Sequence, residues 1–217
     1  MTGSSGPPLA GAPRMSRARA VVVVVVGLLA TGVLVGGLWA WIAPPIHGVV
    51  ALDHTRERVH DYLGTESEHF FVAAFLMLGF LSVVSVVAPV LVWQWREHRG
   101  PGMVAGLSIG LVAAAAAAVA VGAPLVRLRY GVVDFAGAPL THDHPVYYFA
   151  QAPPVFFGRG PLQIAATLLL PASTAALVYA LLAAAATRDD LGGYPAAPQP
   201  PTAVTVSPDA ADTPSRS

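Results

Sequence analysis

Four long apolar stretches alternate with polar segments along this chain. The apolar stretches cover about residues 20–43, 69–95, 102–126 and 161–186. A helix needs about 20 predominantly apolar residues to cross the hydrocarbon core of a bilayer, and each stretch is long enough. The pattern therefore predicts an all-α membrane protein in which four transmembrane helices form one bundle over residues 20–186.

Two long polar segments, residues 44–68 and 127–160, join the first span to the second and the third to the fourth. In the first segment a few apolar residues recur at roughly helical spacing, which predicts a short amphipathic helix lying on the membrane surface. These apolar residues are Leu52, Val59, Tyr62 and Leu63. The second segment could form short strands, or its aromatic residues could lie in the lipid interface.

We expect these two outer segments to pack on each other as a cap. Both are long for connections in a compact bundle, and both carry apolar and aromatic residues that water would not favour. Each has an Ala-Pro-Pro triplet, at residues 43–45 and 152–154, that stiffens the chain next to the membrane. A ligand or partner would then bind at a concave polar surface. The residues expected around this surface are His60, His142, His144, Arg127 and Arg129.

Both ends of the chain have the composition of disordered tails. Residues 1–19 are rich in Gly, Ser and Pro, and residues 187–217 in Pro, Thr and Ala. Arg14, Arg17 and Arg19 lie beside the first span, and the positive-inside rule places them in the cytoplasm. We therefore expect a multi-pass protein of the plasma membrane with both tails cytoplasmic. A cleavable signal peptide is disfavoured, because its apolar region would cover only about 7 to 15 residues.

Composition supports lipid contact and narrows the function classes. The 217 residues are 55% hydrophobic and 11% charged, against about 25% charged residues in an ordinary soluble domain. The lipid bilayer must therefore cover part of the surface. The net charge is zero, which gives no argument for nucleic acid as a partner. The sequence has no cysteine, which excludes disulfides and thiolate metal sites.

Six of the seven histidines lie in or beside the two outer segments, among several aspartates. Imidazole and carboxylate are ligands for zinc and other divalent metals. On an extended strand His142 and His144 would point to the same side, and with His60 they are the candidate metal ligands. Their spacing matches no known class of metal site, so scattered histidines in polar loops are the favoured interpretation and no cofactor is predicted.

Acidic and basic residues are expected to meet at the outer ends of the second and third spans. The short turn between these spans makes them antiparallel neighbours, which places Glu66 and Glu68 at the height of Arg127 and Arg129. Ionisable residues near the membrane usually have partners, so the pattern predicts an ion-pair cluster, with a small site for an anionic ligand as the alternative. Thr65 and Glu68 also match a capping box at the start of the second span.

Glycines recur every fourth residue in two spans, at Gly32 and Gly36 in the first and at Gly102, Gly106 and Gly110 in the third. Faces of small residues let helices approach closely. We expect these faces to serve helix contacts inside the bundle. The formation of a homo-oligomer through such a face is left open.

Candidate chemistry is sparse. The spans carry no charge deep inside, and the chain has no nucleophile elbow, phosphate loop or paired metal-binding helix motif. We therefore expect no enzyme, but a scaffold or accessory subunit that acts through other membrane or envelope proteins. The alternative is a small metal- or anion-binding or transport protein that uses the outer His, Asp and Arg residues.

Four stretches carry a family resemblance: WAWIAPPIHGVVAL, VLVWQWREHRGP, LVRLRYGVVD and APPVFFGRGPLQIAATLLLP. From about residue 20 to 193 the chain resembles an uncharacterised family of four-pass membrane proteins from mycobacteria and related actinobacteria. The resemblance implies a membrane location and a topology, and it brings no catalytic residues with it.

Overall fold

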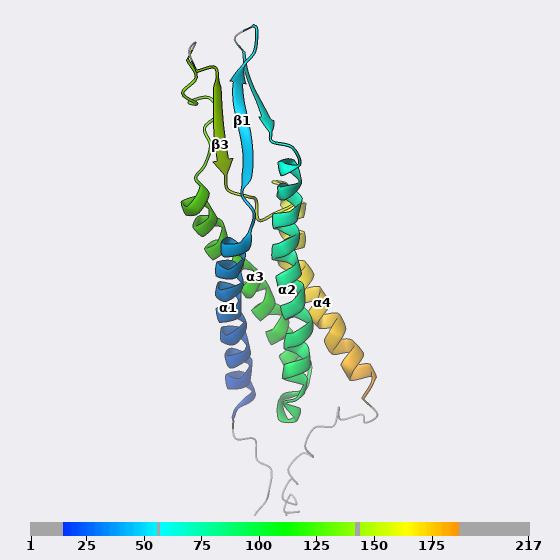
Figure 1. Cartoon of the computed structure of the whole chain (residues 1–217). Coiled ribbons are helices and arrows are strands. Elements are labelled where there is room, and N and C mark those ends of the chain that lie inside the picture. Colours follow the sequence, from blue (N-terminus) through cyan, green and yellow to red (C-terminus); the bar gives the residue numbers. More distant parts are fainter. Residues whose placement is uncertain (1–14, 56, 142–143, 187–217) are drawn as a thin grey trace, which may run out of the picture.

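Four helices stand side by side and a small sheet lies at one end of them (Figure 1). The computed structural model describes residues 15–55, 57–141 and 144–186. The helices are α1 Arg17–Ile42, α2 His69–Trp93, α3 Pro101–Tyr130 and α4 Pro161–Ala184. The strands are β1 Ile46–Leu52, β2 Arg58–Tyr62 and β3 Val146–Gln151, and two short 3-10 turns are η1 Glu66–Glu68 and η2 Arg96–His98.

The four helices lie close to the four apolar stretches of the sequence, and each is long and apolar enough to cross a membrane. Local signals fix their ends. The Ser16 hydroxyl accepts a hydrogen bond from the Arg19 backbone N–H at the start of α1. Proline occupies the first position of both α3 and α4. A backbone N–H at this position would have no acceptor within the helix, so the N–H that proline lacks is not missed. Gly131, with φ of 80°, ends α3.

The closest helix pair is α1 with α3, although they are not consecutive in the chain. A Cβ atom added at Gly32 or Gly36 would collide with the backbone of Ala114 or Ala118 in α3. Gly106 and Gly110 in α3 face α1 in return, whereas Gly102 has nothing within 4 Å. The predicted role of the glycine faces in helix contacts is therefore confirmed for four of the five glycines. Helix α2 packs mainly on α4 and touches α3 only slightly, despite their short turn.

Trp39 joins three helices in the half of the bundle nearest the sheet. Its side chain is fully buried in α1, and its indole N–H donates to the Ala73 carbonyl of α2 over 2.7 Å. The ring also lies over Gly122 of α3, next to the side chain of Met77. Around it lies one of two apolar clusters in the bundle, and Leu107, Leu111 and Tyr179 belong to the other.

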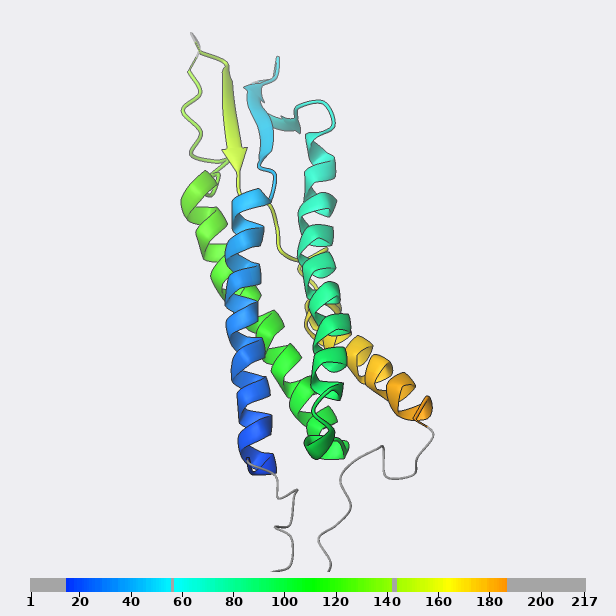
Figure 2. The same ribbon diagram turned by 60° about the horizontal axis from the view of Figure 1, so that its bottom comes forward.

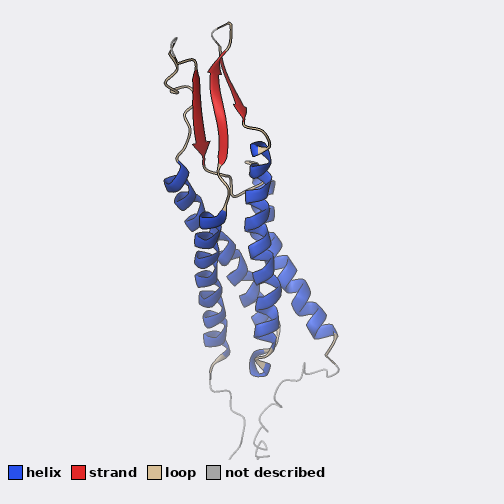
Figure 3. Cartoon of the chain, in the orientation of Figure 1, coloured by secondary structure: helices blue, strands red, loops and turns tan. Residues whose placement is uncertain are grey.

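The predicted surface helix in residues 44–68 is wrong, because this segment forms the antiparallel hairpin β1–β2 (Figure 3). Ile46, Gly48 and Val50 are buried and their neighbours are less so, which is the period of two that a strand requires. Ile46, Val49 and Val50 are β-branched, which favours a pleated conformation. The apolar residues with apparent helical spacing were too few to distinguish the helical period of 3.6 residues from the strand period of two.

Residues 44–68 and 127–160 do form one cap, as predicted. Strand β1 lies between β2 and β3 and pairs antiparallel with both, in register from Ile46 opposite Gln151 to Ala51 opposite Val146. Because β1 follows α1 and β3 precedes α4, the sheet ties the two halves of the chain together. The fold is therefore four apolar helices with a three-stranded sheet, and the all-α prediction is correct only for the helices.

Large apolar side chains cover much of the outer surface of the helices. Leu34 is 72% exposed, Val83 62% and Leu162 78%. Water would not favour such a surface, because the hydrophobic effect opposes contact between apolar area and water. Helix α1 begins at the side of the bundle opposite the sheet, and helix α4 finishes there (Figure 2).

Candidate functional site

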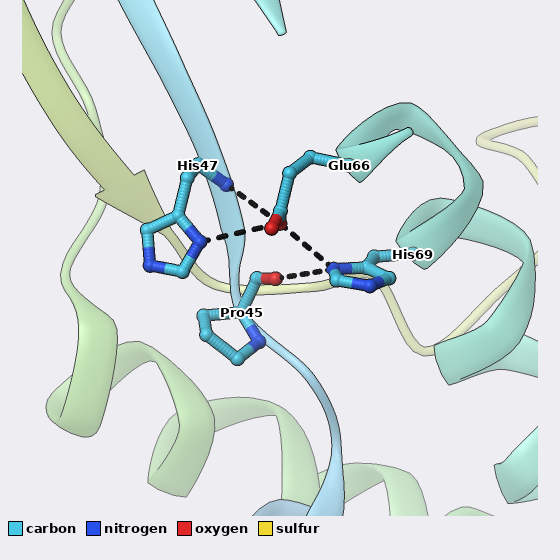
Figure 4. A network of polar contacts seen from close by, with 4 residues as sticks. All are labelled: Pro45, His47, Glu66 and His69. Atoms are coloured by element: carbon cyan, nitrogen blue, oxygen red, sulfur yellow. Dashed lines mark hydrogen bonds and ion pairs between the residues drawn. The ribbon is translucent and has the colours of Figure 1, made fainter. Parts of the chain in front are cut away.

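A polar contact network fixes the sheet to the helices at the start of α2 (Figure 4). One carboxylate oxygen of Glu66 accepts from the His47 backbone N–H and lies 3.2 Å from His47 Nδ1 and 2.9 Å from His69 Nδ1. His69 Nδ1 also lies 2.7 Å from the Pro45 carbonyl oxygen. Both neighbours of His69 Nδ1 are acceptors, so this nitrogen carries the ring proton. Residues at the start of β1 are thereby joined to η1 and α2.

One face of the sheet, which we call the covered face, is covered in part by the segment after α3, and Tyr147 on this face stays 39% exposed. Cross-strand partners share a face, so Val50 of β1, His60 of β2 and Tyr147 of β3 lie on this side, as Gly48 and Phe149 do. The Phe149 ring occupies the space over Gly48 that a Cβ atom would need. The covered face is therefore a small core of its own.

Arg58 and Phe135 hold the covering segment in place. The Arg58 guanidinium donates to the carbonyl oxygens of Phe135, Ala136 and Ala138 over 3.2, 2.5 and 3.1 Å. The Phe135 ring stacks on His60, with ring centroids 4.7 Å apart, and meets Phe149 edge to face. These contacts satisfy carbonyl groups of a segment that has no regular structure of its own.

The opposite side of the sheet, which we call the open face, leaves apolar side chains exposed. Its apolar part is formed by Val49, Ala51, Val59, Val146 and Tyr148, while Asp61, opposite Val49, and His47 lie on the same face. Val59 is 52% exposed, Val146 44% and Tyr148 68%. These side chains come from all three strands and lie next to one another across the sheet, since directly opposed residues are close neighbours.

A pocket of about 560 Å³ lies where the cap meets the helices, and we call it the cap-base pocket. Its walls come from the start of α2, the end of α3 and the connection between β3 and α4. Most of the lining is apolar, including Phe70, Val126, Val155 and Phe156. Two exposed arginines, Arg127 and Arg159, also line it, while no acidic residue of the described chain does.

The structure does not bring the predicted ion cluster together. The partners of Glu66 are His47 and His69, and no ion pair with an arginine is found for Glu66 or Glu68 within the described ranges. Arg129 instead donates to the carbonyl oxygens of Ala40 (3.4 Å) and Trp41 (2.6 Å) at the end of α1. These carbonyl groups have no hydrogen-bond donor within their own helix, so they can accept hydrogen bonds from a guanidinium group.

The predicted capping box at the start of α2 is also wrong. The Thr65 side chain makes no capping hydrogen bond. Only its backbone carbonyl is used, and it accepts from the Glu68 N–H over 2.9 Å in the turn η1. Extra turns of 3-10 type are common at helix starts, and this one turns the Glu66 side chain towards the sheet.

The candidate metal ligands are separated in the cap. His60 stacks on Phe135 in the covered face, and His144 lies in the exposed connection before β3. His142 lies outside the described residues. In the part of the chain that the structure describes, no three metal-ligating side chains come close enough to hold an ion.

Sequence reasoning pointed to part of the cap-base pocket. It singled out Arg127 as a candidate for anion binding, but not Arg159 as its companion. The apolar walls include Phe156 and the Pro153-Pro154 pair, whose aromatic and stiffening character was visible in the sequence. Their packing against α2 and α3 depends on the pairing of β1 with β3, which no local sequence pattern predicts.

These elements define a class of protein: four helices long and apolar enough to cross a membrane, with their connections folded into a small antiparallel sheet at one end. Within that class the chain belongs to the family described as "Protein of unknown function (DUF2567)", whose model matches residues 28–193. The match confirms the expected relationship to an uncharacterised family found in mycobacteria.

Relatives at high identity carry the same description. The chain is 69% identical over 171 residues to "Uncharacterized protein Rv1591" of Mycobacterium tuberculosis (strain ATCC 25618 / H37Rv). The aligned region covers 78% of this chain and 89% of the relative. It is 66% identical over 177 residues to "Uncharacterized protein ML1222" of Mycobacterium leprae (strain TN), covering 82% and 89%. No solved structure matches the chain significantly.

Proposed function

We propose that this protein is an integral protein of the plasma membrane, with both termini in the cytoplasm and the cap outside. The apolar outer surface of the four helices supports membrane insertion. Arg17 and Arg19 lie at the end opposite the cap, together with Arg96 and Arg99 of the turn between α2 and α3. The positive-inside rule favours the cytoplasm for that end.

The orientation can be tested with single cysteines, because the sequence contains none of its own. Thr55 and Thr141 in the cap are expected to react with a membrane-impermeant thiol reagent on intact cells. Glu97, in the turn at the other end, is expected to react only after the membrane is opened. Labelling of Glu97→Cys on intact cells would place the cap in the cytoplasm and contradict the proposal.

For its role we propose a non-enzymatic scaffold or accessory protein that acts through another membrane or envelope protein docked on the open face. The observation that carries this proposal is the exposure of Val59, Val146 and Tyr148 on one face of a sheet whose other face packs on the segment after α3. Exposed apolar patches of this kind are typical of protein interaction sites. Tyrosine is also enriched at the centre of such interfaces.

The docking proposal is tested by a photo-crosslinking residue placed at Tyr148 in the native membrane. We expect an adduct with one membrane or envelope protein, and no adduct from Thr141, which is exposed in the cap but lies outside the open face. Adding Val59→Asp is expected to lower the adduct yield about tenfold, because a charge would be buried in the contact. An adduct with a second copy of this chain, or a yield unchanged by Val59→Asp, would contradict the proposal.

A further inference from the structure

The geometry of the cap-base pocket points to a site for an anionic amphiphile, a molecule with one phosphate or carboxylate head and a hydrocarbon chain. The inference goes beyond the docking role of the open face, and it rests on the proposed membrane placement only for the source of the ligand.

Two guanidinium groups provide the place for the head. Arg127 is in the last turn of α3 and Arg159 in the connection between β3 and α4, and both line the pocket. Among the described residues neither group has a hydrogen bond or an ion pair. A guanidinium presents a fork of N–H donors that matches the oxygens of phosphate and carboxylate. The helix dipole of α3 favours a cation at Arg127, but no helix end accounts for Arg159.

The apolar walls provide the place for the chain. Phe70, Val126, Val155 and Phe156 line the pocket and are buried or half-buried. The lining continues to Phe71, which is 59% exposed on the outer surface of α2. A hydrocarbon chain could therefore reach the pocket along the apolar surface of the bundle, without passing through water.

An aromatic pair extends the same path. Phe157 of the pocket wall meets Phe75 of α2 edge to face, with ring centroids 4.8 Å apart, and Phe75 is 63% exposed. Both rings lie at the end of α2 next to the cap, where the apolar surface of the helices meets polar segments. In the proposed membrane placement, an amphiphile in the bilayer would have its head and the start of its chain at this level.

Size and lining decide between an amphiphile and simpler ligands. The volume of about 560 Å³ lies within the range of about 300 to 1,000 Å³ found for small-molecule sites. A free phosphate ion would use the arginines but would leave the aromatic walls to water. A neutral lipid would cover the walls but would give neither guanidinium an acceptor. Only a ligand that combines both features satisfies the whole lining.

The test compares three probes on the full-length protein in detergent micelles, with binding measured by native mass spectrometry. Oleoyl lysophosphatidic acid has the head and the chain, monooleoylglycerol has the chain without the phosphate, and glycerol 3-phosphate has the head without the chain. We expect the first probe to bind at least about tenfold more tightly than either of the others, since each of them lacks one set of contacts.

Three variants locate the binding. Arg127→Gln with Arg159→Gln is expected to remove the preference for the phosphate-bearing probe, whereas Arg96→Gln, an exposed arginine at the opposite end, is expected to leave it unchanged. Ala123→Leu, which fills the pocket wall, is expected to weaken binding of the probe with the chain. Thermal unfolding of each variant shows whether it has kept its fold.

Several outcomes would overturn the inference. Equal binding of the first two probes would show that the head is not recognised. Binding of glycerol 3-phosphate as tight as that of the first probe would assign the site to a free anion. Retention of the preference in the double arginine variant would place the binding elsewhere. The assay depends neither on orientation in the membrane nor on a partner, so its failure is distinct from that of the proposed function.

Discussion

Replacing Gly32 with alanine is expected to lower the free energy of unfolding by about 3 kcal/mol, the upper end of the typical range for overpacking. The added Cβ would meet the Cα, carbonyl carbon and carbonyl oxygen of Ala114. Backbone atoms in the middle of a helix cannot rotate aside as the end of a side chain can. Helix α1 must therefore separate from α3, and contacts along their whole interface weaken together.

A matched control lies on the same helix. Gly37 has nothing within 4 Å of an added Cβ, so Gly37→Ala is expected to leave stability unchanged or raise it slightly, because alanine favours helix over glycine. Chemical unfolding of both variants in the same detergent measures the difference. Equal stability of Gly32→Ala and Gly37→Ala would mean that α1 and α3 do not approach each other so closely.

Trp39→Ala is expected to destabilise the protein by about 3 to 5 kcal/mol, the range for truncating a buried aromatic residue. The change empties a space between α1, α2 and α3 and removes the hydrogen bond to the Ala73 carbonyl. Trp39→Phe keeps part of the ring volume but not the N–H donor, so a smaller loss than for Trp39→Ala is expected.

The neighbouring tryptophan is the control for this prediction. Trp41 is 72% exposed at the end of the same helix, so Trp41→Ala is expected to change the unfolding free energy by no more than about 0.5 kcal/mol. Unfolding followed by circular dichroism in detergent measures both variants. A loss for Trp41→Ala as large as that for Trp39→Ala would show that the burial of Trp39 is not what stabilises the bundle.

The helices could be predicted because length and apolarity are local properties of a segment. The neighbours of each helix could not be read in the same way. The short turn between α2 and α3 suggested that these two lie side by side, whereas Gly32 and Gly36 allowed α1 to take the place next to α3. A short connection limits the distance between two helix ends but does not fix the contact along their length.

The sheet and the pocket could not be predicted from local sequence patterns for a related reason. Pairing of β1 with β3 joins residues about a hundred positions apart. In the pocket, Phe70, Arg127 and Arg159 come from three separate segments. In place of the predicted ion cluster, Arg129 contacts carbonyl groups at the end of α1 and Glu66 contacts two histidines, and matching opposite charges along the sequence identifies neither kind of partner.

The position of β1 in the centre of the sheet also sets an order of assembly during synthesis. Strand β1 follows directly after α1, but its second neighbour β3 is made only after α2, α3 and the covering segment. Until then one edge of β1 has no hydrogen-bonding partner, and Val50 has no Phe149 to pack beside. Unpaired strand edges of this kind invite wrong pairing between chains. The cap is thus completed only once β3 has been made, and until then the β1–β2 hairpin keeps one open edge.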